Sequence, residues 1–149
     1  CGGVSSGKTT LLRDLCRNLG NRYTVSLIDE RSELAGCCNG IPENDIGVFT
    51  DVYDGIDRER GIISSIRSLS PEIIVCDEIG GMADCEAIMH GFGCGVKFAA
   101  SAHAYNSDEL MKRQCISKLI EQSVFDYIVF LEGSGNAGSI KEIRSLCND

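Results

Sequence analysis

The stretch Cys1-Gly-Gly-Val-Ser-Ser-Gly-Lys-Thr-Thr10 decides the fold that the sequence predicts. Gly2 and Gly7 bracket four residues and are followed by Lys8 and Thr9, which is the G-x-x-x-x-G-K-T pattern of a Walker A loop. Glycines let backbone N–H groups turn towards phosphate oxygens, the lysine can reach the β- and γ-phosphates, and the threonine hydroxyl can bind Mg²⁺. The pattern predicts a nucleoside-triphosphate site formed by Gly2, Gly3, Val4, Ser5, Ser6, Gly7, Lys8, Thr9 and Thr10.

The residues after this loop have the helical spacing that a Walker A motif requires. A helix is predicted from an apolar side made up of Leu11, Leu12, Leu15, Cys16 and Leu19. Gly20 is a suitable end for it. The positive N-terminal end of this helix would face the same phosphates. The alternative is an ordinary glycine–serine turn before a helix, and the complete motif followed by a helix disfavours it.

Length and charge limit what the chain can be. A chain of 149 residues fits one domain with one core, spanning 1–149. The net charge of −8 gives no general attraction for nucleic acid or anionic lipid, and no run of lysines and arginines suggests a local basic patch. No apolar run approaches the roughly 20 residues of a membrane-spanning helix.

The nine cysteines are predicted to be mostly structural. No C-x-x-C pair indicates a zinc site or a thioredoxin-like site. Cys16, Cys76 and Cys85 lie on predicted apolar faces and are expected in the core. The neighbours Cys37 and Cys38 are candidates for redox sensitivity. An odd number of cysteines beside a nucleotide site is typical of a reducing cytoplasm.

Strands and helices are predicted to alternate along the chain. The apolar and β-branched runs predicted as strands are 23–28, 72–76, 96–101 and 125–131. Further helices are expected after Asp57, after Gly81, and from Asn106 to about Gln122. A turn signal at 133–138 predicts that 139–146 returns as an antiparallel strand. This pattern indicates an α/β fold of the P-loop NTPase (RecA/AAA+-like) class, a mostly parallel sheet with helices on both faces and a C-terminal antiparallel hairpin.

Residues 34–56 show no clear period and are rich in glycine. Apolar residues such as Ile46, Val48 and Phe49 argue against plain disorder. A long segment of this kind inside a compact domain is usually functional. We therefore expect a structured loop that crosses the nucleotide site or a subunit boundary.

Carboxylates follow two predicted strands, at the edge where ligands bind in open α/β sheets. Asp77 and Glu78 follow the apolar run 73–76 and form a Walker B motif, in which Asp77 can hold Mg²⁺ and Glu78 can act as general base on the attacking water. Glu30 also follows a strand and is a rival base, and the sequence does not choose between the two glutamates. His103, at the end of the next strand, can sense the γ-phosphate or simply be satisfied by backbone groups.

The start of the sequence predicts a fragment of a longer protein. It has no initiator Met and no signal-like segment. A Walker A loop normally leaves a buried strand, and that strand is absent before Cys1. We expect the domain to lack this first core strand, which would lie next to the Walker B strand, and whatever preceded it.

The order of these motifs resembles that of the secretion and pilus motor ATPases. The Walker A motif, an acidic box at 29–33, the Walker B motif and Ser101-Ala-His-Ala104 follow one another as in that group. Within the group, the chain is similar to the stage III sporulation protein AA family of endospore-forming bacteria. The stretches that carry this resemblance span nearly the whole chain and are Asp29-Glu-Arg-Ser-Glu-Leu-Ala-Gly36, Gly40-Ile-Pro42, Asp45-Ile-Gly47, Thr50-Asp-Val52, Ile66-Arg-Ser-Leu-Ser-Pro-Glu72 and Asp77-Glu-Ile-Gly80.

The resemblance implies Mg²⁺-dependent ATP hydrolysis by a hexameric ring of identical subunits that powers transport or channel assembly in sporulation. Such a ring would lie in the cytoplasm, peripheral to the membrane on the mother-cell side. Its implied partner is a membrane protein of the secretion channel between mother cell and forespore. The family's N-terminal domain is missing from this sequence.

Related motors supply an arginine to the phosphate of a neighbouring subunit. The family pattern commonly has a basic residue where Phe49 and Gly81 stand here. We therefore expect Arg31 in that role, because it lies in the acidic box at the ligand-binding edge of the sheet, with Arg58 and Arg67 as the next candidates. The plainer alternative for each of these arginines is a surface ion pair.

Three functions stay open on the sequence. The intact set of Lys8, Thr9, Asp77 and Glu78 favours an ATP-hydrolysing motor over a nucleotide-binding switch or assembly module with little turnover. A nucleic-acid-linked P-loop ATPase is the third candidate. The acidic charge and the lack of aromatic residues among basic ones disfavour it, so no direct contact with nucleic acid is expected.

Overall fold

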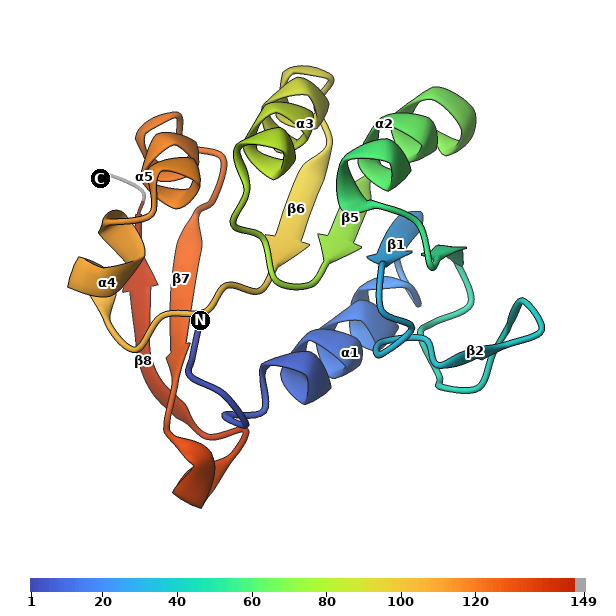
Figure 1. Cartoon of the computed structure of the whole chain (residues 1–149). Helices are drawn as coiled ribbons and strands as arrows, with labels where there is room; N and C mark the ends of the chain where they lie inside the picture. Colours follow the sequence, from blue (N-terminus) through green and yellow to red (C-terminus); the bar gives the residue numbers. More distant parts are fainter. Residues whose placement is uncertain (147–149) are drawn as a thin grey trace.

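A four-stranded parallel sheet lies at the centre of the computed structural model, which describes residues 1–146 (Figure 1). The strands are ordered β4 (Thr50–Asp54), β1 (Val25–Asp29), β5 (Ile73–Cys76) and β6 (Lys97–Ala100). Every residue of β1 is buried, as expected for a strand with helices on both of its faces. The predicted α/β architecture is confirmed.

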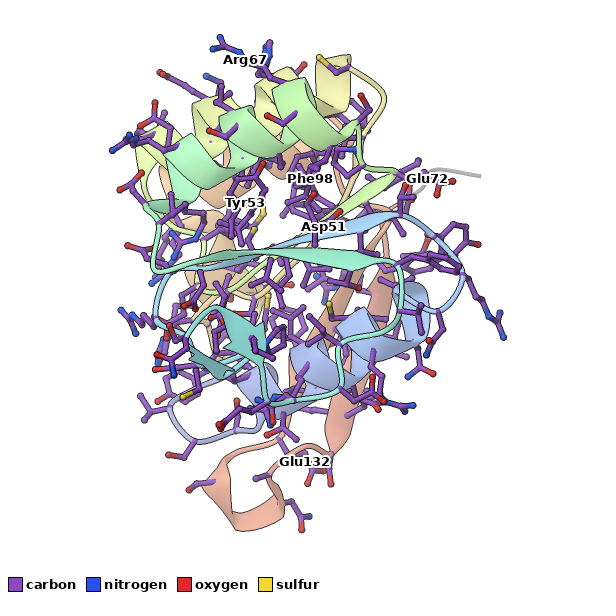
Figure 2. All side chains as sticks on the ribbon, turned by 90° about the vertical axis from the view of Figure 1, so that its right-hand side faces the viewer. Asp51, Tyr53, Arg67, Glu72, Phe98 and Glu132 are labelled. Atoms are coloured by element: carbon purple, nitrogen blue, oxygen red, sulfur yellow. The ribbon has the colours of Figure 1, made fainter. Side chains whose placement is uncertain are left out.

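Helices pack on both faces of this sheet. α1 (Lys8–Leu19) lies on one face, and α2 (Arg58–Leu69) and α3 (Met82–Gly93) lie on the other, as Figure 2 shows from the β4 side. The predicted cap of α2 is present, since the Asp57 carboxylate accepts a hydrogen bond from Arg60 N. Among the residues that the structure describes, no helix is long and apolar enough to cross a bilayer.

Each face of the sheet has its own hydrophobic core. Ile28 and Ile74 pack into the core under α2 and α3, whereas Leu27 and Val75 pack into the core against α1. Phe98 of β6 packs against the first core and lies beneath the helices in Figure 2. Neighbouring residues of one strand therefore serve opposite faces, which is the period of two expected for a strand.

The C-terminal part forms the predicted antiparallel hairpin. It pairs β7 (Tyr127–Leu131) with β8 (Ile140–Ser145), and the 3-10 helix η1 (Ser134–Asn136) lies in the connection. Two short helices precede it, α4 (Ser107–Met111) and α5 (Gln114–Glu121). α5 packs beside α3 and thus extends the layer of helices that α2 and α3 form. The hairpin lies beside the central sheet under this layer (Figure 1).

The single helix expected from Asn106 to about Gln122 is in fact α4 and α5, and that prediction was wrong. Asn106 caps α4 as predicted, because its Oδ1 accepts a hydrogen bond from Glu109 N at 2.9 Å. The chain then becomes extended at Arg113. In a continuous helix Leu110 and Leu119 would point about 180° apart, whereas both are buried in one core. The break allows both leucines to reach that core.

The segment 34–56 contains a strand of the main sheet that the sequence analysis missed. β4 pairs in parallel with β1 along its whole length and forms the edge of the sheet. A small hairpin of β2 (Cys37–Cys38) and β3 (Ile41–Pro42) precedes it. β4 is only partly buried, and an edge strand of this kind needs no continuous apolar run. The segment is structured, as expected, but it is not simply a loop.

The predicted position of the strand before the Walker A loop was wrong. The Walker B strand, β5, already has β1 and β6 on its two sides. Cys1 lies instead between β6 and β7. Leu131 N donates to Cys1 O at 2.8 Å, and Gly2 N donates to Ala102 O at 3.4 Å. An apolar cavity of about 340 Å³ runs from there between β6 and β7, with α1 as a further wall.

The cysteines lie as the sequence predicted. Cys16, Cys76 and Cys85 are fully buried, and the cysteines within residues 1–146 are free thiols. Burial raises the pKa of Cys76 to about 12, so this thiol stays protonated at neutral pH. Cys38 is exposed and Cys37 partly exposed. Cys147 lies outside the described residues.

Candidate functional site

The Walker A loop folds around one of its own carbonyl groups. Ser5 and Gly7 have left-handed backbones, with φ of 58° and 88°, and they turn the chain before α1 begins at Lys8. Lys8 Nζ donates to Gly3 O at 2.6 Å, and Ser6 Oγ donates to the same oxygen at 2.9 Å. The ammonium group is thereby held at the loop. Of the loop residues, Gly2, Gly3 and Ser6 are buried, while Val4, Ser5 and Thr10 are exposed.

The turn of the C-terminal hairpin packs against this loop. Gly138 N donates to Ser6 O at 2.8 Å. A Cβ atom added to Gly7 would lie 2.5 Å from Gly138 N. A Cβ atom on Gly3 would overlap the ring of Tyr105. Gly7 is therefore required both for this close backbone packing and for its left-handed backbone, whereas a side chain at Gly3 would force the exposed Tyr105 ring to move.

Asp77, at the end of β5, joins the Walker B motif to two other parts of the site. Thr9 Oγ1 donates to Asp77 Oδ2 at 3.1 Å. The hydroxyl of Ser101 donates to Asp77 Oδ1, and Glu78 N donates to the same oxygen at 2.9 Å. The carboxylate is thus held by the first turn of α1, the end of β6 and its own chain neighbour.

Ser101 is the site residue that the sequence analysis missed. Its hydroxyl also accepts a hydrogen bond from Glu78 N at 2.9 Å, and the residue is buried. Ser101 therefore fixes both acidic residues of the Walker B motif. Its position directly after the β6 run was the available signal, since the carboxyl ends of neighbouring parallel strands meet at one edge.

The two candidate bases are each paired with an arginine of the same chain, and the pairs differ in exposure. Glu78 contacts Arg31 at 2.8 Å, with side chains 42% and 64% exposed. Glu30 contacts Arg58 at 2.8 Å, with side chains 41% and 13% exposed. Glu78 also has a left-handed backbone, with φ of 51°. The Glu78 pair is a surface contact, and in the Glu30 pair one partner, Arg58, is largely buried.

The three arginines considered for a neighbouring subunit lie in different settings. Arg31 is exposed and pairs with Glu78. Arg58 is almost buried and also pairs with Asp84 at 3.0 Å. Burial disfavours the Arg58 cation, but the nearby Asp84 carboxylate outweighs that effect and the pKa of Arg58 is raised. Arg67 lies on the outer surface of α2 (Figure 2).

Asp29, the first residue of the acidic box at 29–33, holds the turn after β1 in place. Asp29 is buried, and its carboxylate accepts hydrogen bonds from the backbone N–H groups of Glu33, Leu34 and Ala35 at 2.8 to 3.0 Å. The carboxylate thus fixes the turn that follows β1. A small hollow at this edge is lined by Asp29, Glu30, Arg31, Glu33, Arg58, Asp77 and Glu78.

His103 lies beside the start of the Walker A loop. It forms an isolated parallel bridge with Gly2, and its ring contacts the ring of Tyr105 edge-on at 5.4 Å between centroids. The backbone contact agrees with the plainer of the two interpretations of this histidine. A role towards the γ-phosphate stays a prediction.

The residues expected to hold Mg²⁺ fit that ion. Thr9 and Asp77 bring a hydroxyl and a carboxylate oxygen together beside the phosphate loop. Oxygen donors of this kind are what Mg²⁺ prefers, usually completed by water and substrate phosphates.

The sequence matches a family described as "Sporulation stage III, protein AA" over residues 2–146. It is 38% identical over 148 residues to the stage III sporulation protein AA of Bacillus subtilis. The matched region covers 95% of this chain and 48% of that protein. The chain thus spans about half the length of this curated relative.

Two solved structures have the same fold. The VirB11 ATPase of the Brucella suis type IV secretion system, in complex with sulphate, matches 97% of this chain and 48% of its own, with a TM-score of 0.69 and 20% identity. The Legionella pneumophila ATPase DotB matches 87% of this chain and 38% of its own, with a TM-score of 0.66 and 16% identity.

Proposed function

The chain belongs to the sporulation stage III protein AA family, and we propose that it is the ATP-hydrolysing domain of a secretion-type motor that works in sporulation. The observation that carries this proposal is the 3.1 Å contact between Thr9 of the Walker A motif and Asp77 of the Walker B motif. Residues of the two motifs, far apart in the sequence, meet at one edge of the sheet with Glu78 next to them. That is the arrangement a phosphate-transferring site needs.

In this proposal the Walker A loop binds the triphosphate of ATP. Lys8 exchanges the Gly3 carbonyl for phosphate oxygens, because a hydrogen bond between two charged groups is stronger than one to a neutral carbonyl. The N-terminal end of α1 adds its positive dipole. Thr9 and Asp77 hold Mg²⁺, which when bound neutralises part of the phosphate charge.

We assign the general base to Glu78 rather than to Glu30. Its partner, Arg31, is exposed, and a surface ion pair is worth at most about 1 kcal/mol, so Glu78 can leave it at little cost. Glu30 is held by Arg58, a nearly buried cation. Removing a partner from such a cation is far more costly. Glu78 is therefore the carboxylate that can turn towards a water molecule.

We extend the proposal to a ring of identical subunits, hexameric as in the resemblance drawn from the sequence. Arg31 is the first candidate for the arginine given to a neighbour, because it is exposed at the ligand edge. When the ring forms, Arg31 would give up its ion pair with Glu78 and bind the phosphate in the neighbouring subunit. The same change would release Glu78 to act as the base. Arg58 is a poor candidate, since it is held inside its own chain.

The surroundings of this ring are also proposals. We propose that it works at the cytoplasmic face of the membrane on the mother-cell side, with a membrane protein of the sporulation channel as partner. The fold shared with two proteins named as ATPases, one of them from a secretion system, supports this. Because the chain spans about half of its relative, transport by the motor is a property to test on the full-length protein.

We further propose that residues 1–149 are part of a P-loop domain whose strand before Cys1 fills the cavity between β6 and β7. Cys1 already receives a hydrogen bond from β7, and Gly2 donates one to the chain after β6. A strand continued backwards from Cys1 would enter the apolar cavity of about 340 Å³. It would pair with both neighbours and cover their apolar side chains.

Steady-state ATP hydrolysis by the full-length protein tests the function. Glu78→Gln keeps the shape of the side chain but removes the base, so ATP should still bind while phosphate release falls ~10²-fold or more. Glu30→Gln is the comparison at the neighbouring strand end. If Glu30→Gln abolishes hydrolysis and Glu78→Gln does not, the base has been assigned to the wrong carboxylate.

The same measurement separates the motor from the alternative of a switch. Wild-type protein that binds ATP but releases no phosphate, with or without its membrane partner, would show a nucleotide-binding switch or assembly module. Wild-type protein that does not bind ATP would overturn the site altogether. Lys8→Ala is the binding control, because it removes the cation that faces the phosphates.

A further inference from the structure

A partly buried ion network lies behind the Walker B turn. The Asp84 carboxylate, in the first turn of α3, accepts hydrogen bonds from Gly80 N and Gly81 N, both at 3.0 Å. Arg58 Nη1 donates to both oxygens of Asp84 at 3.1 and 3.0 Å, and Arg58 Nη2 donates to Glu30 at 2.8 Å. The side chains of Arg58 and Asp84 are 13% and 11% exposed. One arginine thus links α2, α3 and the edge of β1.

This network fixes the turn that carries Glu78. Gly80 and Gly81 follow Glu78 closely and would allow many backbone conformations if unrestrained. Asp84 holds them on one side, and on the other side Ile79 N donates to Ser101 O at 2.9 Å. The left-handed backbone of Glu78, with φ of 51°, lies within this doubly held turn. The direction of the Glu78 side chain therefore depends on both attachments.

Stability alone does not account for such a network. A buried ion pair loses its hydration, and well-packed apolar residues in its place are often as stable or more stable. Within the described residues, the buried Arg58 Nε also has no hydrogen-bond partner. A largely buried cation with an unsatisfied N–H is a costly way to join two helices. Its fork of donors does, however, hold two carboxylates in a fixed relation, which a lysine cannot do.

We propose that Arg58 and Asp84 are positioning residues for ATP hydrolysis. Asp84 fixes the Gly80–Gly81 turn and through it Glu78, and Arg58 fixes Asp84 relative to Glu30 across the carboxyl edge of the sheet. The inference rests on the proposed function, with Glu78 as base. The hydrogen bonds of the network run to residues 30, 80 and 81, so the Walker A loop keeps its own contacts. The network therefore controls turnover and not nucleotide affinity.

The test uses four variants of the full-length protein. Asp84→Ala removes both side-chain hydrogen bonds to the turn, and Asp84→Asn keeps an oxygen that can still accept from Gly80 and Gly81. Arg58→Lys keeps the charge but cannot bridge two carboxylates. The fourth variant combines Asp84→Ala with Arg58→Lys. Glu86→Ala on α3 and Arg60→Lys on α2 are matched controls, since both residues are exposed on the same helices.

The expected result is a loss of kcat without a loss of binding. Asp84→Ala and Arg58→Lys should each lower kcat about 10-fold or more, because a small displacement of a catalytic group is enough for this. The Kd for a fluorescent ATP analogue should stay within about 2-fold. Asp84→Asn should recover part of the turnover. The double variant should be little worse than Asp84→Ala alone, because the two residues act through one contact.

Three outcomes would overturn the inference. Unchanged kcat in Asp84→Ala and Arg58→Lys would show that the turn needs no support. Equal losses of affinity and kcat, with lowered thermal stability, would show a purely structural role; if Asp84→Ala fails to fold, Asp84→Asn and Arg58→Lys decide the same question. No turnover by the wild-type protein would overturn the proposed function and this inference with it, whereas normal wild-type turnover with unaffected variants would overturn the inference alone.

Discussion

Replacing Ser101 by alanine should slow hydrolysis while leaving ATP binding nearly intact. The hydroxyl of Ser101 donates to Asp77 Oδ1 and accepts from Glu78 N at 2.9 Å. Its loss frees the two Walker B residues on the β6 side. Asp77 keeps its hydrogen bonds from Thr9 and from Glu78 N, so the carboxylate is not left without partners. The effect should therefore be a loss of position, with no general collapse of the site.

The size of the effect follows from the kind of hydrogen bond removed. A hydrogen bond to a charged group contributes about 1.5–3 kcal/mol. If that contribution is realised in the transition state, each ~1.4 kcal/mol corresponds to a tenfold change in rate. Ser101→Ala should then lower kcat roughly 10- to 150-fold. The Kd for ATP should change little, because Lys8 and the loop are untouched.

Ser26, in β1 of the same sheet, provides a matched control. It is fully buried in β1, and its Oγ has no hydrogen-bond partner among residues 1–146. Ser26→Ala therefore removes a buried hydroxyl without removing a hydrogen bond. Phosphate release, nucleotide titration and thermal unfolding should be measured on both full-length variants. Ser101→Ala with wild-type kcat, or Ser26→Ala with an equal loss, would refute the reasoning.

Four further predictions concern other parts of the chain. Gly7→Ala should abolish nucleotide binding in a titration, because φ is 88° and Gly138 N leaves no room for a methyl group; undiminished affinity would contradict the loop geometry. Maleimide at pH 8 should modify exposed Cys38 and spare Cys76, whose buried thiol has a pKa raised to about 12 and forms thiolate only as the pH nears that value; mass spectrometry of folded protein checks this. Specific activity should rise steeply with protein concentration, and Arg31→Ala subunits mixed with wild-type should inhibit beyond dilution; a proportional decline would mean that subunits work alone. Residues 1–149 alone should be poorly soluble or lack a sharp thermal transition, and adding the residues that precede Cys1 in the full-length protein should restore one.

The parts of the fold that the sequence predicts well are those set by local pattern. The α1 helix follows from its apolar side and from the Walker A motif, and the strands β1 and β5 follow from apolar runs that end in acidic residues. β4 escaped detection because an edge strand is only half covered and lies in a glycine-rich segment. No glycine or proline at the break between α4 and α5 indicates in the sequence that the helix ends there. It follows only from the need to bury Leu110 and Leu119 in the same core.

The sequence names candidate residues for the site but not their pairings. Lys8, Thr9, Asp77 and Glu78 follow from motif spacing. The partners of the two glutamates do not, because Arg31 and Arg58 reach Glu78 and Glu30 only through the stacking of strands and helices that are distant in sequence. A surface ion pair was the plainer alternative for Arg31, and the fold shows such a pair, with Glu78 as the partner.

The contact between the hairpin turn and the Walker A loop has a mechanical consequence. Gly138 N holds Ser6 O at 2.8 Å, and Gly7 lies so close to Gly138 that not even a methyl group fits between them. A loop that changes shape as it takes up or loses a phosphate must therefore push the turn aside or break that hydrogen bond. The turn joins β7 to β8, a strand whose residues are all exposed, so a movement of the Walker A loop would be passed through the turn to a strand on the outer surface of the domain.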